Sequence, residues 1–584
     1  MAQRFQGRIQ AWQPRNEPDH RPFGGHLIDE ICAYQKAAYL GFKRADPDVL
    51  VCWSPYALPT ALHRDGMLAN ETWAYFDVYT MHSYRPPETY LHELATIRDG
   101  ASGRPIWLTE AGKAVPYAAG THPRDPTPTD MRRQAEFITR SYASSLFAGV
   151  DRHFYYILGD GGDSPSRTVD WGLLRSDFTP RPAYVALAAV GRFLANARCL
   201  GRLGSTAYVF RGRPDGVASD VLVAWPDADG QNPAAELARG GRAYDFLGRS
   251  LDTPAERTSG SRPVFAILPE GRADSLELES PPARSPLRTD PPSPIVLQAV
   301  LPRERARLPD QAYEIPATEP SQIPVNVYNF GDTTAYGRLH IEDPSPAVQA
   351  SVQGADLELP PNDRQEILLR IVPDASAAGA LAAGVAVTLR GEFGAAGRPV
   401  LALRLAADPR DLVPKLRVPI PLADDAERWR PQTSAGTTMR SSFANLGALA
   451  FDLEFAGDQP WAAPYIDLHQ PERPASGVAA LAYTVQLLEG AARVRVTFTE
   501  RSEDAIHHYR PDVPLILDSH APRRIVQRFA ECPWVEFLSS TDPTKTRDSR
   551  VQPERLFRIY VNIGPQPGQP QVRLILSDFE WIGF

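Results

Sequence analysis

Residues Arg8 to His20 read RIQAWQPRNEPDH and place a carboxylate directly after a short predicted strand. The apolar and polar residues before Pro14 alternate only weakly, so the strand is predicted mainly from the turn-forming cluster Asn16-Glu17-Pro18 that follows. In parallel α/β proteins, functional side chains gather at the carboxyl ends of strands. Glu17 is therefore the first candidate for a functional residue.

A second stretch, RPIWLTEAG from Arg104 to Gly112, has the same form. It predicts a buried strand that ends in Glu110. At roughly 30 residues for each strand-helix unit, Glu110 follows Glu17 by about three units. Two carboxylates on strands three apart in a barrel can face each other across its mouth.

The first 198 residues predict a repeating order of strand and helix. Apolar residues at helical spacing favour four helices, and short apolar runs favour five strands. The predicted strands are 8–13, 49–53, 77–84, 104–110 and 153–158, and the predicted helices are 27–43, 89–98, 130–148 and 182–197.

Four motifs in this region resemble the retaining β-glycosidases of clan A. Asn16-Glu17-Pro18 resembles the end of the clan's fourth barrel strand, and Thr109-Glu110 the end of the seventh. DVYTMHSY at 77–84 resembles the sixth strand with its His-x-Tyr pair, and WGLLRSDFTPRPAY at 171–184 resembles the passage from the eighth strand into the last helix. The resemblance covers roughly the first 200 residues and implies a (β/α)₈ TIM barrel.

Under that resemblance the five strands are barrel strands four to eight, and the first three strand-helix units are missing. A complete barrel typically takes about 250 residues. An open set of five parallel strands would also leave two unpaired edges. The expectation is therefore a partial TIM barrel, the carboxyl-terminal part of a longer protein. The alternative is an open five-stranded α/β sheet with no glycosidase history.

Retaining glycosidases use two carboxyl groups roughly 5–5.5 Å apart. The resemblance implies Glu110 as the nucleophile and Glu17 as the acid/base. It also implies that Asn16 bonds the sugar 2-hydroxyl, that Tyr84 positions Glu110, and that His82 lines the sugar site. The alternative is a pair of surface or salt-bridged glutamates beside a core tyrosine and a hydrogen-bonded histidine.

Aromatic side chains near these motifs are candidates for stacking on sugar faces, although aromatic residues more often pack in cores. The candidates are Trp53, Tyr156 and Trp171. The tryptophans of the carboxyl-terminal part carry the same two readings, with core packing favoured: Trp429, Trp461, Trp534 and Trp581.

Beyond residue 198 the periodicity changes to two, which is typical of strands. Residues 199–283 predict a small β-domain, and a Pro/Ser/Arg-rich linker follows at 280–294. The short strands at 295–408 suit an immunoglobulin-like β-sandwich. Those at 413–584 suit a jelly-roll that could bind carbohydrate. The predicted fold class is therefore multidomain, α/β plus all-β.

Composition excludes several classes of function. A net charge of −8 over 584 residues argues against a nucleic-acid surface. There is no apolar run of 18 residues, so no membrane span is predicted. No nucleotide-binding or serine-hydrolase motif is present, and His26 and Glu30 lack a third ligand, so neither a cofactor nor a metal is predicted.

The predicted function is hydrolysis of O-glycosyl bonds in poly- or oligosaccharides by a retaining β-glycosidase. Its rival is a non-catalytic carbohydrate-binding or cell-surface protein that keeps a barrel remnant. MAQRFQGRIQ at the amino terminus is no signal peptide, and a secreted or cell-envelope location is inferred from the modular style alone. The sugar, the linkage and the oligomeric state stay open at this stage.

Overall fold

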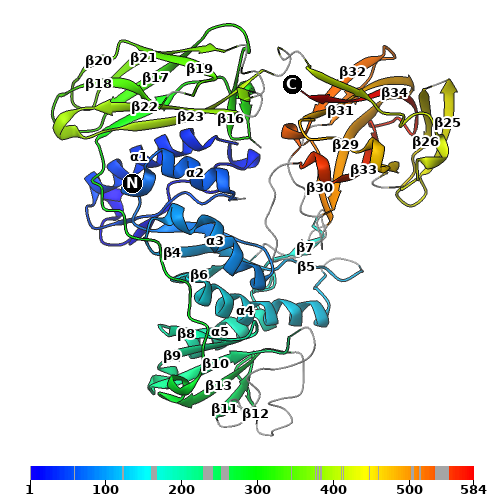
Figure 1. Ribbon diagram of the computed structural model, residues 1–584. Helices are drawn as coiled ribbons and strands as arrows, with labels where there is room; N and C mark the ends of the chain where they lie inside the picture. Colours follow the sequence, from blue (N-terminus) through cyan, green and yellow to red (C-terminus); the bar gives the residue numbers. More distant parts are fainter. Residues whose placement is uncertain are drawn as a thin grey trace. The chain divides into compact units, whose positions relative to one another are not determined.

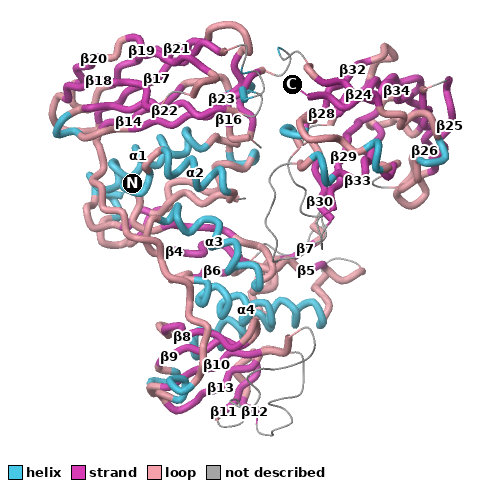
Figure 2. The backbone as a smooth tube through the Cα atoms, viewed as in Figure 1, coloured by secondary structure: helices cyan, strands magenta, loops and turns pink. Residues whose placement is uncertain are grey.

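The chain divides into two compact units, residues 1–294 and 295–584. The computed structural model describes residues 2–583 apart from 58, 121–123, 160–166, 228–240, 252–261, 309, 344, 375–376, 378–379, 382–383, 409–410, 412–413, 446, 458–459, 502–505, 512–513 and 533–550. Helices and strands alternate in the first half of the first unit, and strands dominate the second unit (Figure 2).

Five short parallel strands follow one another in space in the same order as in the chain. β1 pairs with β2, a single bridge between Cys52 and Val78 continues the set, and β3, β4 and β6 complete it. Each of the five strands predicted from the sequence is confirmed. Their assignment to strands four to eight of a barrel stays a prediction. The bounds are β1 Ala11–Trp12, β2 Leu50–Val51, β3 Tyr79–His82, β4 Ile106–Ala111 and β6 Arg152–Tyr155.

The helices of the first unit bury apolar faces against these strands. Ile31 and Leu94 pack in one core with Leu108 of β4, so the helical spacing in the sequence reports burial correctly. Thr127 caps α4, because its hydroxyl accepts a hydrogen bond from the Asp130 backbone N–H at 3.1 Å. The bounds are α1 Ile28–Ala45, α2 Ala61–Ala69, α3 Tyr90–Ala101, α4 Pro128–Ala148 and α5 Pro182–Leu194.

An antiparallel sheet in the order β12-β11-β13-β10-β9-β8 follows the last helix. Phe193 of α5 contacts Phe265 of β13, with ring centroids 4.7 Å apart. The sheet therefore shares a core with α4 and α5. Its strands are β8 Arg198–Leu203, β9 Ala207–Gly212, β10 Ser219–Ala224, β11 Arg242–Asp245, β12 Ser250–Leu251 and β13 Val264–Pro269.

The predicted linker at 280–294 lies against the first unit. The Trp73 indole N–H donates to Asp290 at 2.8 Å, and the Tyr75 hydroxyl donates to the Ser293 carbonyl at 3.1 Å. At Gly103, where φ is +81°, a Cβ would lie 2.5 Å from the Leu287 Cα. Only glycine fits where residue 103 contacts the backbone of residue 287, because both the backbone conformation and the lack of space exclude a side chain.

The second unit begins with two sheets whose strands bury alternate residues. Their orders are β14-β17-β21-β19 and β15-β16-β23-β22-β18-β20. The bounds are β14 Ile295–Ala299, β15 Ala306–Arg307, β16 Ala312–Ile315, β17 Ser321–Asn329, β18 Ala335–Glu342, β19 Val348–Gln353, β20 Asp356–Leu359, β21 Arg364–Pro373, β22 Val385–Glu392 and β23 Val400–Ala407.

The last strands of the second unit form two further sheets. Residue 413, where the jelly-roll was predicted to begin, lies outside the described residues. The orders of the two sheets are β25-β26-β34-β28-β32, with β24 beside β34, and β27-β33-β29-β30, with β31 beside β29. Figure 1 shows the paired strands β25 and β26 side by side. The bounds are β24 Leu416–Pro419, β25 Thr438–Asn445, β26 Ala448–Glu454, β27 Tyr465–Asp467, β28 Ala480–Glu489, β29 Ala492–Arg501, β30 Ile506–Tyr509, β31 Leu515–Leu517, β32 Arg523–Arg528, β33 Leu556–Pro565 and β34 Gln571–Gly583.

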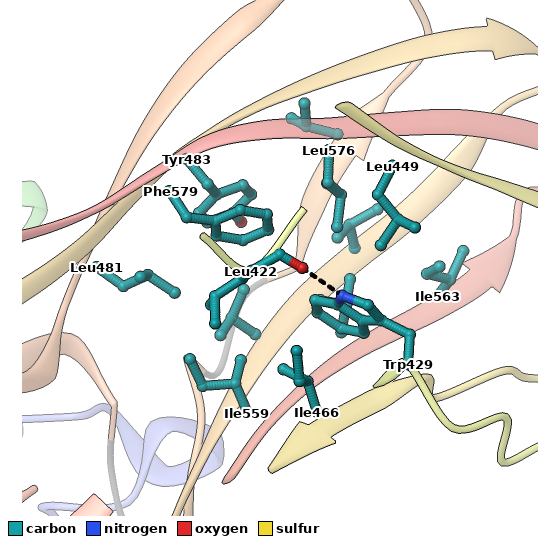
Figure 3. Close-up of a cluster of buried hydrophobic side chains, with 14 of the residues drawn as sticks. Leu422, Trp429, Leu449, Ile466, Leu481, Tyr483, Ile559, Ile563, Leu576 and Phe579 are labelled. Atoms are coloured by element: carbon teal, nitrogen blue, oxygen red, sulfur yellow. Dashed lines mark hydrogen bonds between the residues drawn. The ribbon is translucent and has the colours of Figure 1, made fainter. Parts of the chain in front are cut away.

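One hydrophobic core joins these last two sheets (Figure 3). Trp429 lies in it with its indole N–H bonded to the Leu422 carbonyl at 2.8 Å, which satisfies the one polar atom of the ring. Trp581 is also buried, as the sequence favoured, whereas Trp461 is 42% exposed. Trp534 lies outside the described residues. No helix among the described residues is long and apolar enough to cross a membrane.

Candidate active site

Glu17 and Glu110 meet at the carboxyl ends of their strands. One oxygen of each carboxylate and the ring nitrogen of His82 all lie within 4.8 Å of one another. His82 ends β3 and stands beside Glu110 of β4 in the parallel register. The two glutamates, far apart in the sequence, therefore share one site.

His82 links the two carboxylates. Its Nδ1 lies 2.8 Å from Glu17 Oε1 and 3.6 Å from Glu110 Oε2. The 2.8 Å contact is a hydrogen bond, and the tautomer of His82 decides which of the two atoms donates. The imidazole is nearly buried, with 1% of its side chain exposed. His82 therefore holds Glu17 in one orientation.

The backbone of Glu17 adopts a left-handed conformation, with φ at 43°. For a residue other than glycine this conformation costs about 1 kcal/mol or more. The turn is held from both sides, since the His20 N–H donates to the Glu17 carbonyl and the His26 N–H to the Pro18 carbonyl. The surrounding hydrogen bonds thus fix an unfavourable backbone geometry that points Glu17 at His82.

Tyr84 contacts Glu110 directly. The phenol donates to Glu110 Oε2 at 2.5 Å, which is a short charge-assisted hydrogen bond. Burial, and then the bond to Glu110, raise the pKa of Tyr84 far above its ordinary value. The phenol consequently stays protonated and keeps donating to this oxygen.

Three aromatic rings form a group next to Glu110. The ring of Tyr84 lies 4.9 Å from that of Trp171 and 6.1 Å from that of Tyr156, with planes at 73° and 90°. A pocket of about 500 Å³ opens here, lined by Tyr84 and Trp171 together with the basic side chains Lys113 and Arg133. The described residues that line it do not include Glu17 or Glu110. Two of the three rings, those of Tyr84 and Trp171, therefore line the pocket, and Tyr156 does not.

Of the two remaining predicted residues, Asn16 lies at the site and Trp53 does not. Asn16 accepts a hydrogen bond from the Gln13 side chain at 3.3 Å and lies next to Glu17 at the site. Trp53 has no exposed surface and packs against Tyr56 and Phe76. The prediction that Trp53 stacks on a sugar is therefore wrong in this structure. Its strand buries the side chain beneath the helices instead.

The sequence did not indicate the residues that hold Trp171 in place. The preceding Asp170 is buried in an ion pair with Arg181 at 2.6 Å and accepts a bond from the Tyr117 hydroxyl at 2.7 Å. Burial opposes the charge of Asp170, but these two hydrogen bonds outweigh it and lower its pKa. A buried aspartate thus anchors the loop that carries Trp171.

Gly112 is a second residue that the sequence did not single out. A Cβ at this position would lie 2.3 Å from the Tyr156 carbonyl oxygen and 3.3 Å from the Trp171 ring. Glycine therefore allows the strand end after Glu110 to approach the aromatic group. The signal in the sequence was the Glu-Ala-Gly that ends the predicted strand.

Glu17, His82 and Glu110 are also the types of ligand that transition metals take. Around a tetrahedral zinc with bonds of roughly 2.0–2.2 Å, neighbouring ligand atoms lie about 3.3–3.6 Å apart. The 2.8 Å contact between His82 and Glu17 is shorter than that and has the length of a hydrogen bond. The arrangement fits a hydrogen-bonded pair better than two ligands of one ion.

No family model matches the chain, and no curated protein matches it. Among solved structures it is similar to a family 11 carbohydrate-binding module from Clostridium thermocellum, at 11% identity over 29% of this chain and 95% of the module, with a TM-score of 0.24.

Two solved glycosidases are also similar. A GH39 β-xylosidase from Caulobacter crescentus is 18% identical over 37% of this chain and 47% of that one, with a TM-score of 0.26. A Bacteroides uniformis β-glucuronidase is 11% identical over 98% of this chain and 54% of that one, with a TM-score of 0.24. The chain spans about half the length of these two enzymes. At these TM-scores the likeness assigns no activity, so the function proposed below rests on the geometry of the site.

Proposed function

We propose that the chain is a glycoside hydrolase that cleaves O-glycosyl bonds with retention of configuration. The observation that carries the proposal is the meeting of Glu17 and Glu110, with one oxygen of each within 4.8 Å. Retaining enzymes place the two carboxyl groups roughly 5–5.5 Å apart, whereas inverting enzymes separate them by about 6.5–9.5 Å. The spacing thus favours retention. The five parallel strands then correspond to strands four to eight of a TIM barrel.

In the proposed reaction Glu110 attacks the anomeric carbon and forms a covalent glycosyl ester. Glu17 donates its proton to the departing glycosidic oxygen as that bond breaks. Glu17 then takes a proton from water, whose oxygen attacks the anomeric carbon and releases Glu110. Tyr84 orients the nucleophilic carboxylate, and His82 orients Glu17. Tyr156 and Trp171 offer flat apolar faces to the sugar ring, and Asn16 is placed to bond the 2-hydroxyl.

The alternative is a non-catalytic carbohydrate-binding or cell-surface protein. One observation favours it: the pocket is lined by Tyr84 and Trp171 and not by the two glutamates. A protein that only binds sugar would need the rings and could keep the carboxylates in a purely structural hydrogen-bonded cluster.

Hydrolysis of a panel of activated aryl β-glycosides tests the proposal. Turnover of one member by the full chain should fall on the order of 10⁴-fold in Glu110→Gln, because the nucleophile is lost. Glu270→Gln, an exposed carboxylate of the same unit, should leave turnover unchanged. A 2-fluoro glycoside should leave its sugar covalently attached to the peptide that contains Glu110.

Turnover that survives Glu110→Gln would exclude Glu110 as the nucleophile. Sugar binding without any hydrolysis across the panel would favour the alternative. Thermal unfolding of each variant distinguishes a lost reaction from a lost fold.

A further inference from the structure

One face of the last sheet carries a regular row of polar side chains. In the β29–β33 register Arg493 stands opposite Gly564, and Arg495 opposite Asn562. The residues between them on β29, Val494 and Val496, point into the core. The period of two thus gives the strands one apolar face and one polar face. The next cross-strand pair on the polar face is Thr497 with Tyr560.

This face lines a hollow of about 650 Å³, which is within the usual size of ligand sites. Its positively charged lining residues are Arg493, Arg495 and Arg510. None of the described lining residues is an aspartate or a glutamate. Burial, and then the charge of Arg558, lower the pKa of His508 to about 4. His508 therefore adds a neutral ring at neutral pH, and the charged side chains among the described lining residues are arginines.

The same hollow contains aromatic surface. Trp461 is 42% exposed, although the sequence favoured a core position for it. Its backbone is fixed to Ser434, since the Trp461 N–H donates to Ser434 Oγ at 3.0 Å and the Ser434 N–H donates to the Trp461 carbonyl at 3.0 Å. Part of the large apolar ring of Trp461 is therefore open to a ligand, on a backbone segment that is fixed.

Polar groups suited to hydroxyls complete the lining. The Asn562 amide donates to Thr497 Oγ1 at 2.7 Å, which fixes both side chains on the floor of the hollow. The same amide donates to the Arg495 carbonyl at 3.3 Å, so the Asn562 amide oxygen is the group that can accept from a sugar hydroxyl. Guanidinium groups bind planar anions through paired N–H groups.

We propose that this hollow, defined by Arg493, Arg495, Trp461 and Asn562, binds an anionic polysaccharide. A sugar ring lies on Trp461, and its carboxylate or sulfate group contacts the arginines. The proposal stands apart from the proposed hydrolysis, because every residue that carries it belongs to residues 432–564. The net charge of −8 disfavours general attraction to polyanions, so binding must come from a local site.

Affinity electrophoresis of the full chain tests the proposal with gels that contain polygalacturonate, dextran sulfate or neutral dextran. We expect retardation by a charged polymer and none by dextran. Polygalacturonate tests recognition of a carboxylate, and dextran sulfate tests recognition of a sulfate. Arg495→Gln should weaken binding about tenfold, which is the loss expected for a hydrogen bond to a charged group. Trp461→Ala should weaken binding while leaving its dependence on salt unchanged.

Arg440→Gln is the matched control, because Arg440 is exposed on β25 of the other sheet and the charge change is the same. Its affinity should equal that of the unaltered chain. Three results would overturn the proposal: no retardation by either charged polymer, an equal loss in Arg440→Gln, or tighter Arg495-dependent binding to oligothymidylate. If the variants unfold at the same temperature as the unaltered chain, a weaker affinity results from the loss of a contact in the hollow and not from unfolding.

Discussion

The site of the first unit and the hollow of the second unit are built on opposite charges. Glu17 and Glu110 are hydrogen-bonded to a histidine and a tyrosine, whereas Arg493 and Arg495 line their hollow. The first arrangement gathers single side chains from the ends of β3 and β4 and the turn after β1. The second repeats along one face of paired strands. The difference suggests chemistry in one unit and attachment in the other.

The largest expected effect separates these two roles. Glu17→Gln should slow hydrolysis of an alkyl β-glycoside about 10³-fold, because the leaving oxygen loses its general acid. For a substrate whose phenolate leaves readily, kcat/KM should fall by less than about tenfold, because kcat/KM reports the first step and not the attack of water that Glu17 assists. Steady-state kcat/KM values on the two substrates measure the difference, and polymer binding in the gel should not change. Equal slowing on both substrates would contradict the acid role.

The next effect concerns stability of the first unit alone. Gly103→Ala should lower its free energy of unfolding by about 3 kcal/mol, since the methyl group meets the Leu287 backbone and the conformation is left-handed. Gly149→Ala is the control, because its φ is +104° with nothing within 4 Å. Denaturant unfolding should give Gly103→Ala a clearly lower free energy of unfolding than Gly149→Ala. Similar losses in both would mean that the crossing of 280–294 contributes little.

A third effect compares two half-buried histidines, one in each unit. Burial lowers the pKa of His153 to about 3, and burial with nearby positive charge lowers that of His508 to about 4. Below pH 6.5 these histidines bind protons in the unfolded chain but stay neutral in the folded chain. The free energy of unfolding therefore falls as the pH drops.

At pH 5 each histidine should cost about 2 kcal/mol. His153→Gln should therefore flatten the pH dependence of unfolding of the first unit between pH 6.5 and 3. His508→Gln should do so for the second unit between pH 6.5 and 4. Denaturant unfolding over this range gives both slopes. An unaltered slope in either variant would contradict the assignment.

The smallest effect tests how Glu110 is positioned. Tyr84→Phe should lower kcat about tenfold with little change in KM, because Glu110 loses a hydrogen bond but the pocket keeps its ring. Tyr336→Phe is the control, since Tyr336 also donates to a glutamate, Glu358, at 3.1 Å, but in the second unit. A rise in KM with kcat unchanged would assign Tyr84 to sugar binding alone.

Secondary structure was predicted where the pattern is long or bounded by turns. The strands around Glu17 and Glu110 and the helix at 130–148 form as expected. The helix Ala61–Ala69 was missed, since nine residues give too few turns for a periodic signal. The candidates Glu17 and Glu110 were chosen because one follows and the other ends a predicted strand, and Asn16, His82 and Tyr84 were chosen through the resemblance. Trp461 was expected in the core and is exposed, whereas the stacking candidate Trp53 is buried, as aromatic residues more often are. Burial of an aromatic ring depends on which elements cover it.

Local pattern in the chain determined where strands and helices form and which carboxylates end the strands. These features depend on neighbours a few residues away, which the sequence displays directly. Only the tertiary structure shows that His82 lies between the two glutamates and that position 103 must be glycine beside the Leu287 backbone. It also shows that Trp461 is exposed in a hollow lined by arginines. Each of these depends on contacts between residues distant in sequence, which packing and strand register establish.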